Sequence, residues 1–193
     1  DAHPDRPLAS GSITLDNARR FVYVLWTLSV TCVLTGAYFL HADGKSPIEL
    51  IAIYAIAVTL MTTYDHGPTL KNTGLRGNIS ISVMVGAVIL YGASSVGNLW
   101  TPLVWWTAAL VFFANLAREI IKDCQDMEAD EGNRTTLPMT YGLVKSRMLA
   151  YVIVMAALVC LYIPYWKGPT PSSFEYQNNT GSQLTLLSKV QKN

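Results

Sequence analysis

Charged side chains are scarce in this sequence. They make up 14% of its 193 residues, whereas an average soluble domain carries roughly a quarter. Apolar residues account for 51% of the chain, and the charged residues are concentrated in a few segments between long apolar stretches. A soluble enzyme is therefore disfavoured, and the composition is typical of a protein that lies in a lipid bilayer.

A strong excess of positive charge is also missing. The formal net charge is +1 at pH 7, and no run of five or more basic residues occurs. Because binding to a nucleic-acid backbone depends on clustered Lys and Arg, we exclude nucleic acid as a partner.

Cysteine is rare as well. Cys32, Cys124 and Cys160 are widely spaced, so they match neither a disulfide framework nor a CxxC metal site. The first residues do not show the basic and then apolar pattern of a signal peptide. We expect the sequence to begin inside a longer protein.

Long apolar segments are present instead. A helix needs about 20 mostly apolar residues to cross a bilayer. Five segments approach this length: residues 21–40, 48–64, 79–99, 104–121 and 148–165. Short connectors rich in Gly, Pro, Asp and Asn separate them. We therefore predict an all-α integral membrane protein with a five-span transmembrane bundle over residues 21–165.

The basic residues indicate how these helices are oriented. Lys45 is alone in the short connectors of one side, whereas ten basic residues lie on the other: Arg6, Arg19, Arg20, Lys71, Arg76, Arg118, Lys122, Arg134, Lys145 and Arg147. Lys and Arg beside membrane helices stay in the cytoplasm. We predict a multi-pass cell-membrane protein whose loop 1–20 and active site face the cytoplasm. Residues 166–193 should form a polar tail, truncated or rearranged.

Carboxylates cluster at the end of the fourth apolar segment. Glu119, Asp123, Asp126 and Asp130 follow one another at spacings of four, three and four, which would place them on one face of a helix. Carboxylates at this spacing repel each other unless a cation lies between them. Magnesium prefers oxygen ligands and commonly bridges one or two carboxylates to substrate phosphates. The row is a candidate Mg²⁺ site, and a solvated helix end is the alternative.

Basic and polar side chains accompany these acids. Arg118 and Lys122 flank the row and suit phosphate oxygens, but as positive loop residues they also determine topology. Another loop on the same side contains Tyr64, Lys71 and Asn78, each of which an interfacial role would also explain. Together with the acidic start of the chain, these loops form the mouth of an apolar bundle. We interpret the arrangement as a diphosphate site above a pocket for a hydrocarbon chain.

Three segments resemble the UbiA superfamily of intramembrane prenyltransferases: HPDRPLASGSIT, YD followed by LKNTGLRGN, and NLAREIIKDCQDMEADEGNRTTLPMTYG. The third is the most specific. Its combination of REI, KD, a row of acids, TLP and a glycine is most similar to the archaeal digeranylgeranylglyceryl phosphate synthases. The family fold has nine membrane helices, and the resemblance implies that this chain supplies the third to the seventh.

The resemblance implies Mg²⁺-dependent transfer of a geranylgeranyl group from geranylgeranyl diphosphate to a lipid acceptor, geranylgeranylglyceryl phosphate. It assigns Asp123, Asp126 and Asp130 to the family's second aspartate motif, as catalytic metal ligands. Asp1 would be the last carboxylate of the first motif, which otherwise lies upstream. Substrate-binding roles then fall to Arg6, Tyr64, Lys71, Asn78, Arg118 and Lys122. With only part of the first motif present, we expect these 193 residues to be inactive alone.

Other functions remain open at this point. A UbiA-type enzyme that prenylates an aromatic ring, of the quinone, tocopherol or chlorophyll type, needs the same metal diphosphate site. A membrane transporter or structural protein is a different class, but transporters place ionisable groups within their spans, and here charges lie at the span ends. The D-x-x-D-G-x-x-A-R pattern of a CDP-alcohol phosphotransferase is absent from the sequence.

Overall fold

Helices account for nearly all of the regular structure. The structure, a computed structural model, describes residues 7–8, 10–65, 73–130 and 135–166. The long helices are α1 (Leu15–Ala42), α2 (Ile48–Asp65), α3 (Leu75–Ser94), α4 (Pro102–Gln125) and α7 (Leu143–Trp166), and two short ones, α5 (Met127–Asp130) and α6 (Leu137–Tyr141), connect the last pair. These ranges contain no strand, only an isolated bridge between Thr73 and Thr135. The predicted all-α fold is confirmed.

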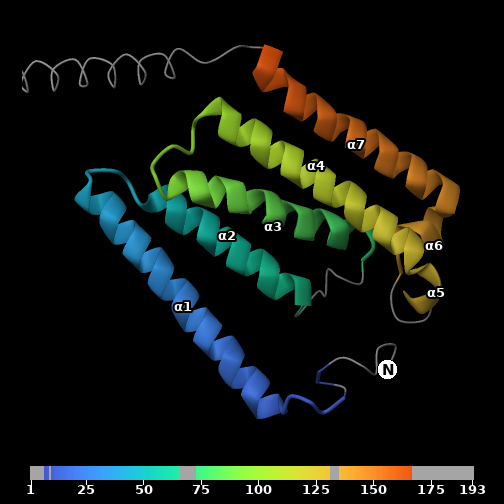
Figure 1. Cartoon of the computed structure of the whole chain (residues 1–193), viewed down its shortest axis with the longest axis horizontal. Helices are drawn as coiled ribbons and strands as arrows, with labels where there is room; N and C mark the ends of the chain where they lie inside the picture. The colour runs from blue at the N-terminus through green and yellow to red at the C-terminus, as the bar shows by residue number, and fades with distance from the viewer. Residues whose placement is uncertain (1–6, 9, 66–72, 131–134, 167–193) are drawn as a thin grey trace, which may run out of the picture.

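The five long helices lie next to one another in chain order (Figure 1). The main contacts are those of α4 with α3 and α7, followed by those of α2 with α3. α1 touches α2 near its C-terminal end, where Val33, Ala37 and Leu40 are buried. The other end of α1 diverges from the remaining helices (Figure 1).

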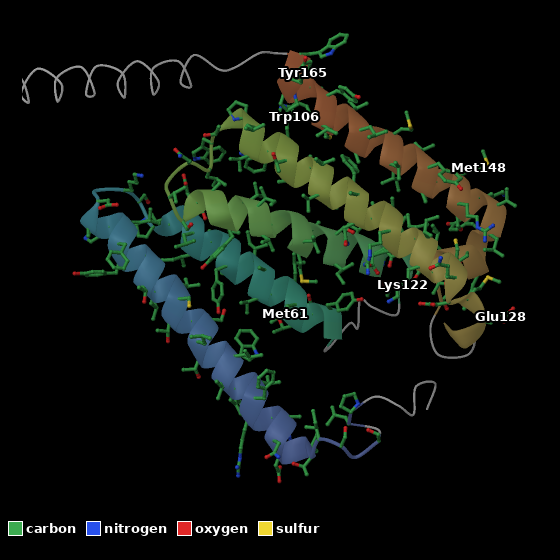
Figure 2. All side chains as sticks on the ribbon, viewed as in Figure 1. Met61, Trp106, Lys122, Glu128, Met148 and Tyr165 are labelled. Atoms are coloured by element: carbon green, nitrogen blue, oxygen red, sulfur yellow. The ribbon has the colours of Figure 1, made fainter. Side chains whose placement is uncertain are left out.

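Successive long helices run in opposite directions, so the connectors alternate between two ends of the molecule. The Lys45 end, as we call it, contains the α1–α2 and α3–α4 connectors. The Asp123 end contains the last turn of α4 together with the first turns of α3 and α7. Figure 2 shows Lys122 and Glu128 at the Asp123 end and Tyr165 far from it.

Apolar side chains cover the exposed faces of the helices. On α1 and α7 the exposed ones include Phe21, Val24, Leu28, Met148, Val152 and Met155. A contiguous apolar surface of this kind is unfavourable in water, and hydrocarbon is its natural surrounding. By length and composition, α1, α3, α4 and α7 could each cross a membrane, and the apolar part of α2, Ile48–Tyr64, is shorter. The chain is therefore a multi-pass membrane protein.

The helices extend beyond several of the predicted spans. α1 begins at Leu15 instead of Phe21, and α4 continues to Gln125 instead of ending at Ile121. Hydropathy detects only the part of a helix inside hydrocarbon, whereas backbone hydrogen bonds continue the helix into the polar region. α3 ends at Ser94, because Gly97 adopts a positive φ of 73° and the following N–H returns to the carbonyl of Ala93.

The Lys45 end is fixed by two hydrogen bonds. The Lys45 ammonium donates to the main-chain oxygen of Val96 at 2.7 Å, and the indole N–H of Trp100 donates to Glu49 at 2.6 Å. These bonds tie the α1–α2 connector and the first turn of α2 to the α3–α4 connector. The Asp123 end carries a different set of polar contacts.

Candidate functional site

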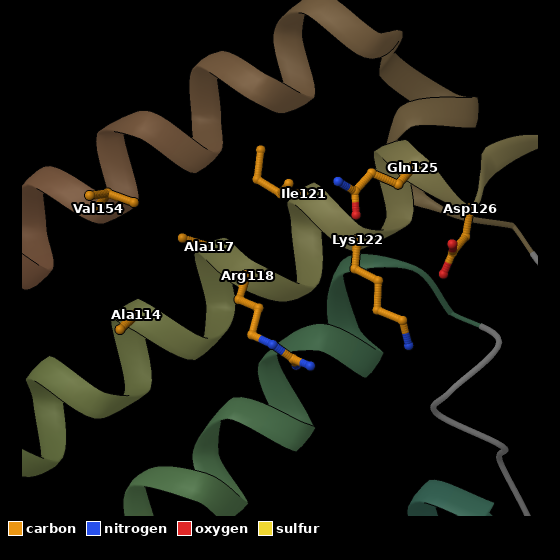
Figure 3. A pocket seen from close by; sticks show the side chains of 8 residues that line it. All are labelled: Ala114, Ala117, Arg118, Ile121, Lys122, Gln125, Asp126 and Val154. Atoms are coloured by element: carbon orange, nitrogen blue, oxygen red, sulfur yellow. The ribbon is translucent and has the colours of Figure 1, made fainter.

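The last turns of α4 line a cavity of about 590 Å³ at the Asp123 end. Arg118, Lys122 and Asp126 follow one another at intervals of four residues and form a row on the cavity, in which Arg118 and Lys122 lie inside α4 and Asp126 is its C-cap. In Figure 3 the side chains of Arg118 and Lys122 extend to the same side, and Asp126 lies beyond them. The neighbouring wall consists of Ala117, Ile121 and Gln125 from α4 and Val154 from α7. Two cations and a carboxylate thus border an otherwise mostly apolar cavity.

The helix breaks within the row of acids that the sequence predicted on a single face. Asp126 is the C-cap of α4, with φ −90° and ψ 7°, and α5 begins at the next residue. Only Glu119 and Asp123 of the four lie inside α4. The expected continuous helical face is therefore wrong, because the helix ends before its third acid.

Asp123 takes a different direction from Asp126. Its side chain is buried, with 3% exposure, and its Oδ2 accepts a hydrogen bond of 2.7 Å from the amide of Asn78. Asn78 lies in the first turn of α3 and is itself 8% exposed. Asp126 is half-buried. The structure therefore places one predicted ligand beside α3 and another on the cavity.

Two further polar residues continue the contact between α3 and α4. The hydroxyl of Ser82 donates to the main-chain oxygen of Asn78 at 2.6 Å and accepts from the amide of Asn115 at 3.1 Å. Neither residue was predicted from the sequence as part of the site. They gave a usable signal, because Ser82 and Asn115 lie within predicted apolar spans, where a polar side chain is costly unless another group pairs with it.

Backbone contacts join the loops at this end. Thr73, before α3, pairs with Thr135, before α6, in a parallel bridge. Gly74 has a φ of +57°, and a Cβ at this position would lie 3.0 Å from the carbonyl oxygen of Thr135. The close approach of the two segments thus depends on glycine.

The other predicted site residues fall into two groups. Tyr64 is half-buried near the end of α2, and Arg118, which is exposed, forms an ion pair with the neighbouring Glu119. Asp1, Arg6 and Lys71 lie outside the described residues, and the side chain of Asp130, the last residue of α5, is also not described.

An apolar groove lies between α1, α2 and α3. It has a volume of about 430 Å³, and its lining residues are Val22, Leu25, Trp26, Ser29, Tyr54, Ala57, Val58, Met61 and Met84. A second cavity of about 290 Å³ shares Ser29, Tyr54, Ala57 and Met84 with it. Ser29 and Tyr54 form a 3.1 Å hydrogen bond between α1 and α2. The surroundings suit a hydrocarbon chain, with one polar pair among them.

The acids of this end fit Mg²⁺ by their chemistry. Within the part of the chain that the structure describes, no group of three or more His, Cys, Asp or Glu side chains could hold a metal ion. Magnesium, however, usually takes one or two carboxylates and completes its shell with water and phosphate oxygens. Asp126 offers one such carboxylate on the cavity, next to the cation of Lys122.

The fold and this site define a helical membrane protein with a charged cavity where one membrane helix ends. Residues 1–174 match the model of the UbiA prenyltransferase family, and the chain belongs to that family. Its membership confirms the resemblance found in the sequence and argues against a transporter or a structural protein.

Curated relatives with the name digeranylgeranylglyceryl phosphate synthase are similar to this chain. The Methanopyrus kandleri protein is 33% identical over 86% of this chain and 56% of its own length. The Methanosarcina barkeri protein is 35% identical over 84% of this chain and 52% of its own length. The Sulfolobus acidocaldarius protein is 28% identical over 86% of this chain and 56% of its own length. The chain thus spans about half the length of these relatives. No solved structure gives a significant match.

Proposed function

We propose that the protein transfers a geranylgeranyl group from geranylgeranyl diphosphate to geranylgeranylglyceryl phosphate in archaeal ether-lipid synthesis, with Mg²⁺ as cofactor. The row of Arg118, Lys122 and Asp126 on the cavity is the observation that carries the proposal. Family membership and the names of the relatives support the same chemistry.

The cations of the row would bind the diphosphate. Arg118 can donate two parallel hydrogen bonds to phosphate oxygens, and Lys122 adds a compact charge one turn later. Arg6, Lys71 and Tyr64 are further candidates from the sequence for the same anion.

Asp126 would hold the metal, together with Asp130 and Asp1, whereas Asp123, which the sequence predicted as a further ligand, is buried against Asn78. When bound there, Mg²⁺ supplies positive charge to the diphosphate oxygens as the bond to the prenyl carbon breaks. Lys122 and Arg118 neutralise the same oxygens from the row. Departure of the diphosphate leaves an allylic cation, which the hydroxyl oxygen of the acceptor attacks with loss of its proton, and an ether bond forms.

The apolar helices would hold the hydrocarbon and exclude water. An allylic cation reacts with any nearby water, so a dry cavity protects it until the acceptor attacks. The groove between α1, α2 and α3 is large and apolar enough for part of a prenyl chain. Since ten of the 14 basic residues are predicted from the sequence to lie on this side, we propose that the site is on the cytoplasmic face of the cell membrane.

A transfer assay tests the proposal. The protein is expressed from its complete coding sequence, and its membranes receive labelled geranylgeranyl diphosphate, Mg²⁺ and either geranylgeranylglyceryl phosphate or an aromatic acceptor. We expect an ether product. Product on the aromatic acceptor alone would assign the protein to the other branch of the family, and no product on either acceptor contradicts the proposal.

Two pairs of variants test the cavity row. Lys122→Met should raise KM for the diphosphate about tenfold or more, since one phosphate contact is worth about 1.5–3 kcal/mol. Its control, Lys145→Met, removes an exposed lysine of α7 at the same end that does not line the cavity. Asp126→Asn should raise the half-saturating Mg²⁺ concentration, whereas Glu128→Gln, an exposed acid of α5, should leave it unchanged.

A further inference from the structure

We propose that a chain of hydrogen bonds between α3 and α4, Asp123–Asn78–Ser82–Asn115, sets the rotation of α4 and thereby positions Lys122 and Asp126 on the cavity. Asp123 and Asn78 would act as positioning residues and not as ligands of metal or substrate. The inference rests on the proposed function, since it concerns the same site.

The periodicity of the helix makes rotation decisive. Consecutive residues of an α-helix are 100° apart, so Lys122 and Asp123 cannot face the same neighbour. Because Asp123 faces α3, Lys122 and Asp126 face the cavity. A small rotation of the last turn about the helix axis would withdraw both side chains together.

Two contacts between the helices fix that rotation. The amide of Asn78 donates to Asp123 from the first turn of α3. One turn further along α3, Ser82 donates to the main-chain oxygen of Asn78 and accepts from Asn115 of α4. Asn115 and Asp123 are eight residues apart, so α4 is held to α3 at two points about 12 Å apart along its axis.

Burial supports the positioning role. Asp123 is 3% exposed, Asn78 is 8% exposed and Ser82 is fully buried. A buried carboxylate is stable only when donors compensate for its lost hydration. Asn78 supplies such a donor, and the bond is directional, so it selects one orientation of the two helices. Asp126, in contrast, is half-buried and lines the cavity.

Exchange of the two partners separates the roles. Asn78→Asp places two carboxylates face to face and should lower transfer activity about 10- to 100-fold, as loss of a supporting contact typically does. The double variant Asn78→Asp with Asp123→Asn restores one amide and one carboxylate, and we expect it to regain most of the activity. If Asp123 is a metal ligand, the double variant stays impaired, and its remaining activity needs a higher Mg²⁺ concentration. This result would overturn the inference.

A pair of serines provides the matched control. Ser82 and Ser94 are both buried in α3, and both donate to main-chain oxygens of that helix. Ser82 also accepts from Asn115 of α4. Ser82→Ala should lower kcat with little change in the melting temperature, and Ser94→Ala should alter neither. Equal activity of the two variants would contradict the inference.

A readout that needs no catalysis keeps the two proposals distinguishable. The substitution Lys122→Cys is made in a protein whose Cys32, Cys124 and Cys160 are replaced by alanine. The rate at which this cysteine reacts with a water-soluble maleimide reports the rotation of α4. We expect Asn78→Asp to change this rate severalfold and the double variant to restore it. An unchanged rate would refute the positioning role, whether or not the unmutated protein transfers a prenyl group. The proposed function is tested separately, by the transfer assay on the unmutated protein.

Discussion

Gly86 allows a close approach of α3 and α4, and its replacement is a sharp test of this packing. A Cβ at position 86 would lie 3.1 Å from the carbonyl oxygen of Ala108 and 3.4 Å from the Cβ of Phe112. Small residues are a common means of close helix approach in membranes. The obstacle here is backbone, which cannot move aside as a flexible side chain does.

The same helix contains its own control. Gly92 is exposed, and a Cβ there would meet nothing within 4 Å. Exchange of a helical glycine for alanine gains up to about 1 kcal/mol in helix propensity at either position. At position 86 the overpacking term of about 1–3 kcal/mol opposes this gain. Gly92→Ala should therefore be neutral or stabilising, and Gly86→Ala should be less stable than it by about 1–3 kcal/mol.

Thermal unfolding in detergent, followed by tryptophan fluorescence, measures the difference. For a chain of this size each kcal/mol shifts the midpoint by roughly 2–4 °C. Leucine at the two positions should widen the difference, because Gly86→Leu has to separate the helices. Equal midpoints for Gly86→Leu and Gly92→Leu would refute the close approach of α3 and α4.

Three further predictions concern the two ends of the molecule. Gly74→Ala should lower the unfolding free energy by about 1–3 kcal/mol because of the positive φ alone, and further because of the contact with the facing loop. It should therefore unfold at a lower temperature than Gly142→Ala, whose position has a φ of +87° but no neighbour within 4 Å. Trp100→Phe removes an indole N–H bonded to a carboxylate of α2 and should lower the unfolding free energy by about 0.5–1.5 kcal/mol, since Trp100 is largely exposed. Single cysteines at Lys45 and Lys122 should react with an impermeant maleimide from opposite sides of the membrane, and labelling of both from one side would contradict the topology.

The helical content was readily predicted from the sequence, whereas the limits of the helices were not. Apolar runs mark only where hydrocarbon surrounds a helix, so α1 begins before the expected span at Phe21 and α4 continues past Ile121. The break at Asp126 was also missed. The acids on both sides of this break match helical spacing, but α4 ends where the backbone φ and ψ angles leave the helical region.

No local sequence pattern could predict the polar contact between Asn78 and Asp123. The two residues are 45 positions apart, and their hydrogen bond exists only because α3 packs against α4. Sequence reasoning selected both residues but gave them separate roles, as a substrate contact and a metal ligand. Ser82 and Asn115 were passed over, since one serine or asparagine in an apolar span has no visible partner until two helices are placed together.

By itself the sequence determined that the chain is helical, that it lies in a membrane and which end carries the charge. Hydrocarbon offers no hydrogen bonds to the backbone, so long apolar segments have to form helices. The tertiary structure alone decided that Lys122 and Asp126 line a cavity while Asp123 faces α3. A helix can turn about its axis at no cost to its own hydrogen bonds, and only contacts with a neighbouring helix fix the direction of each side chain.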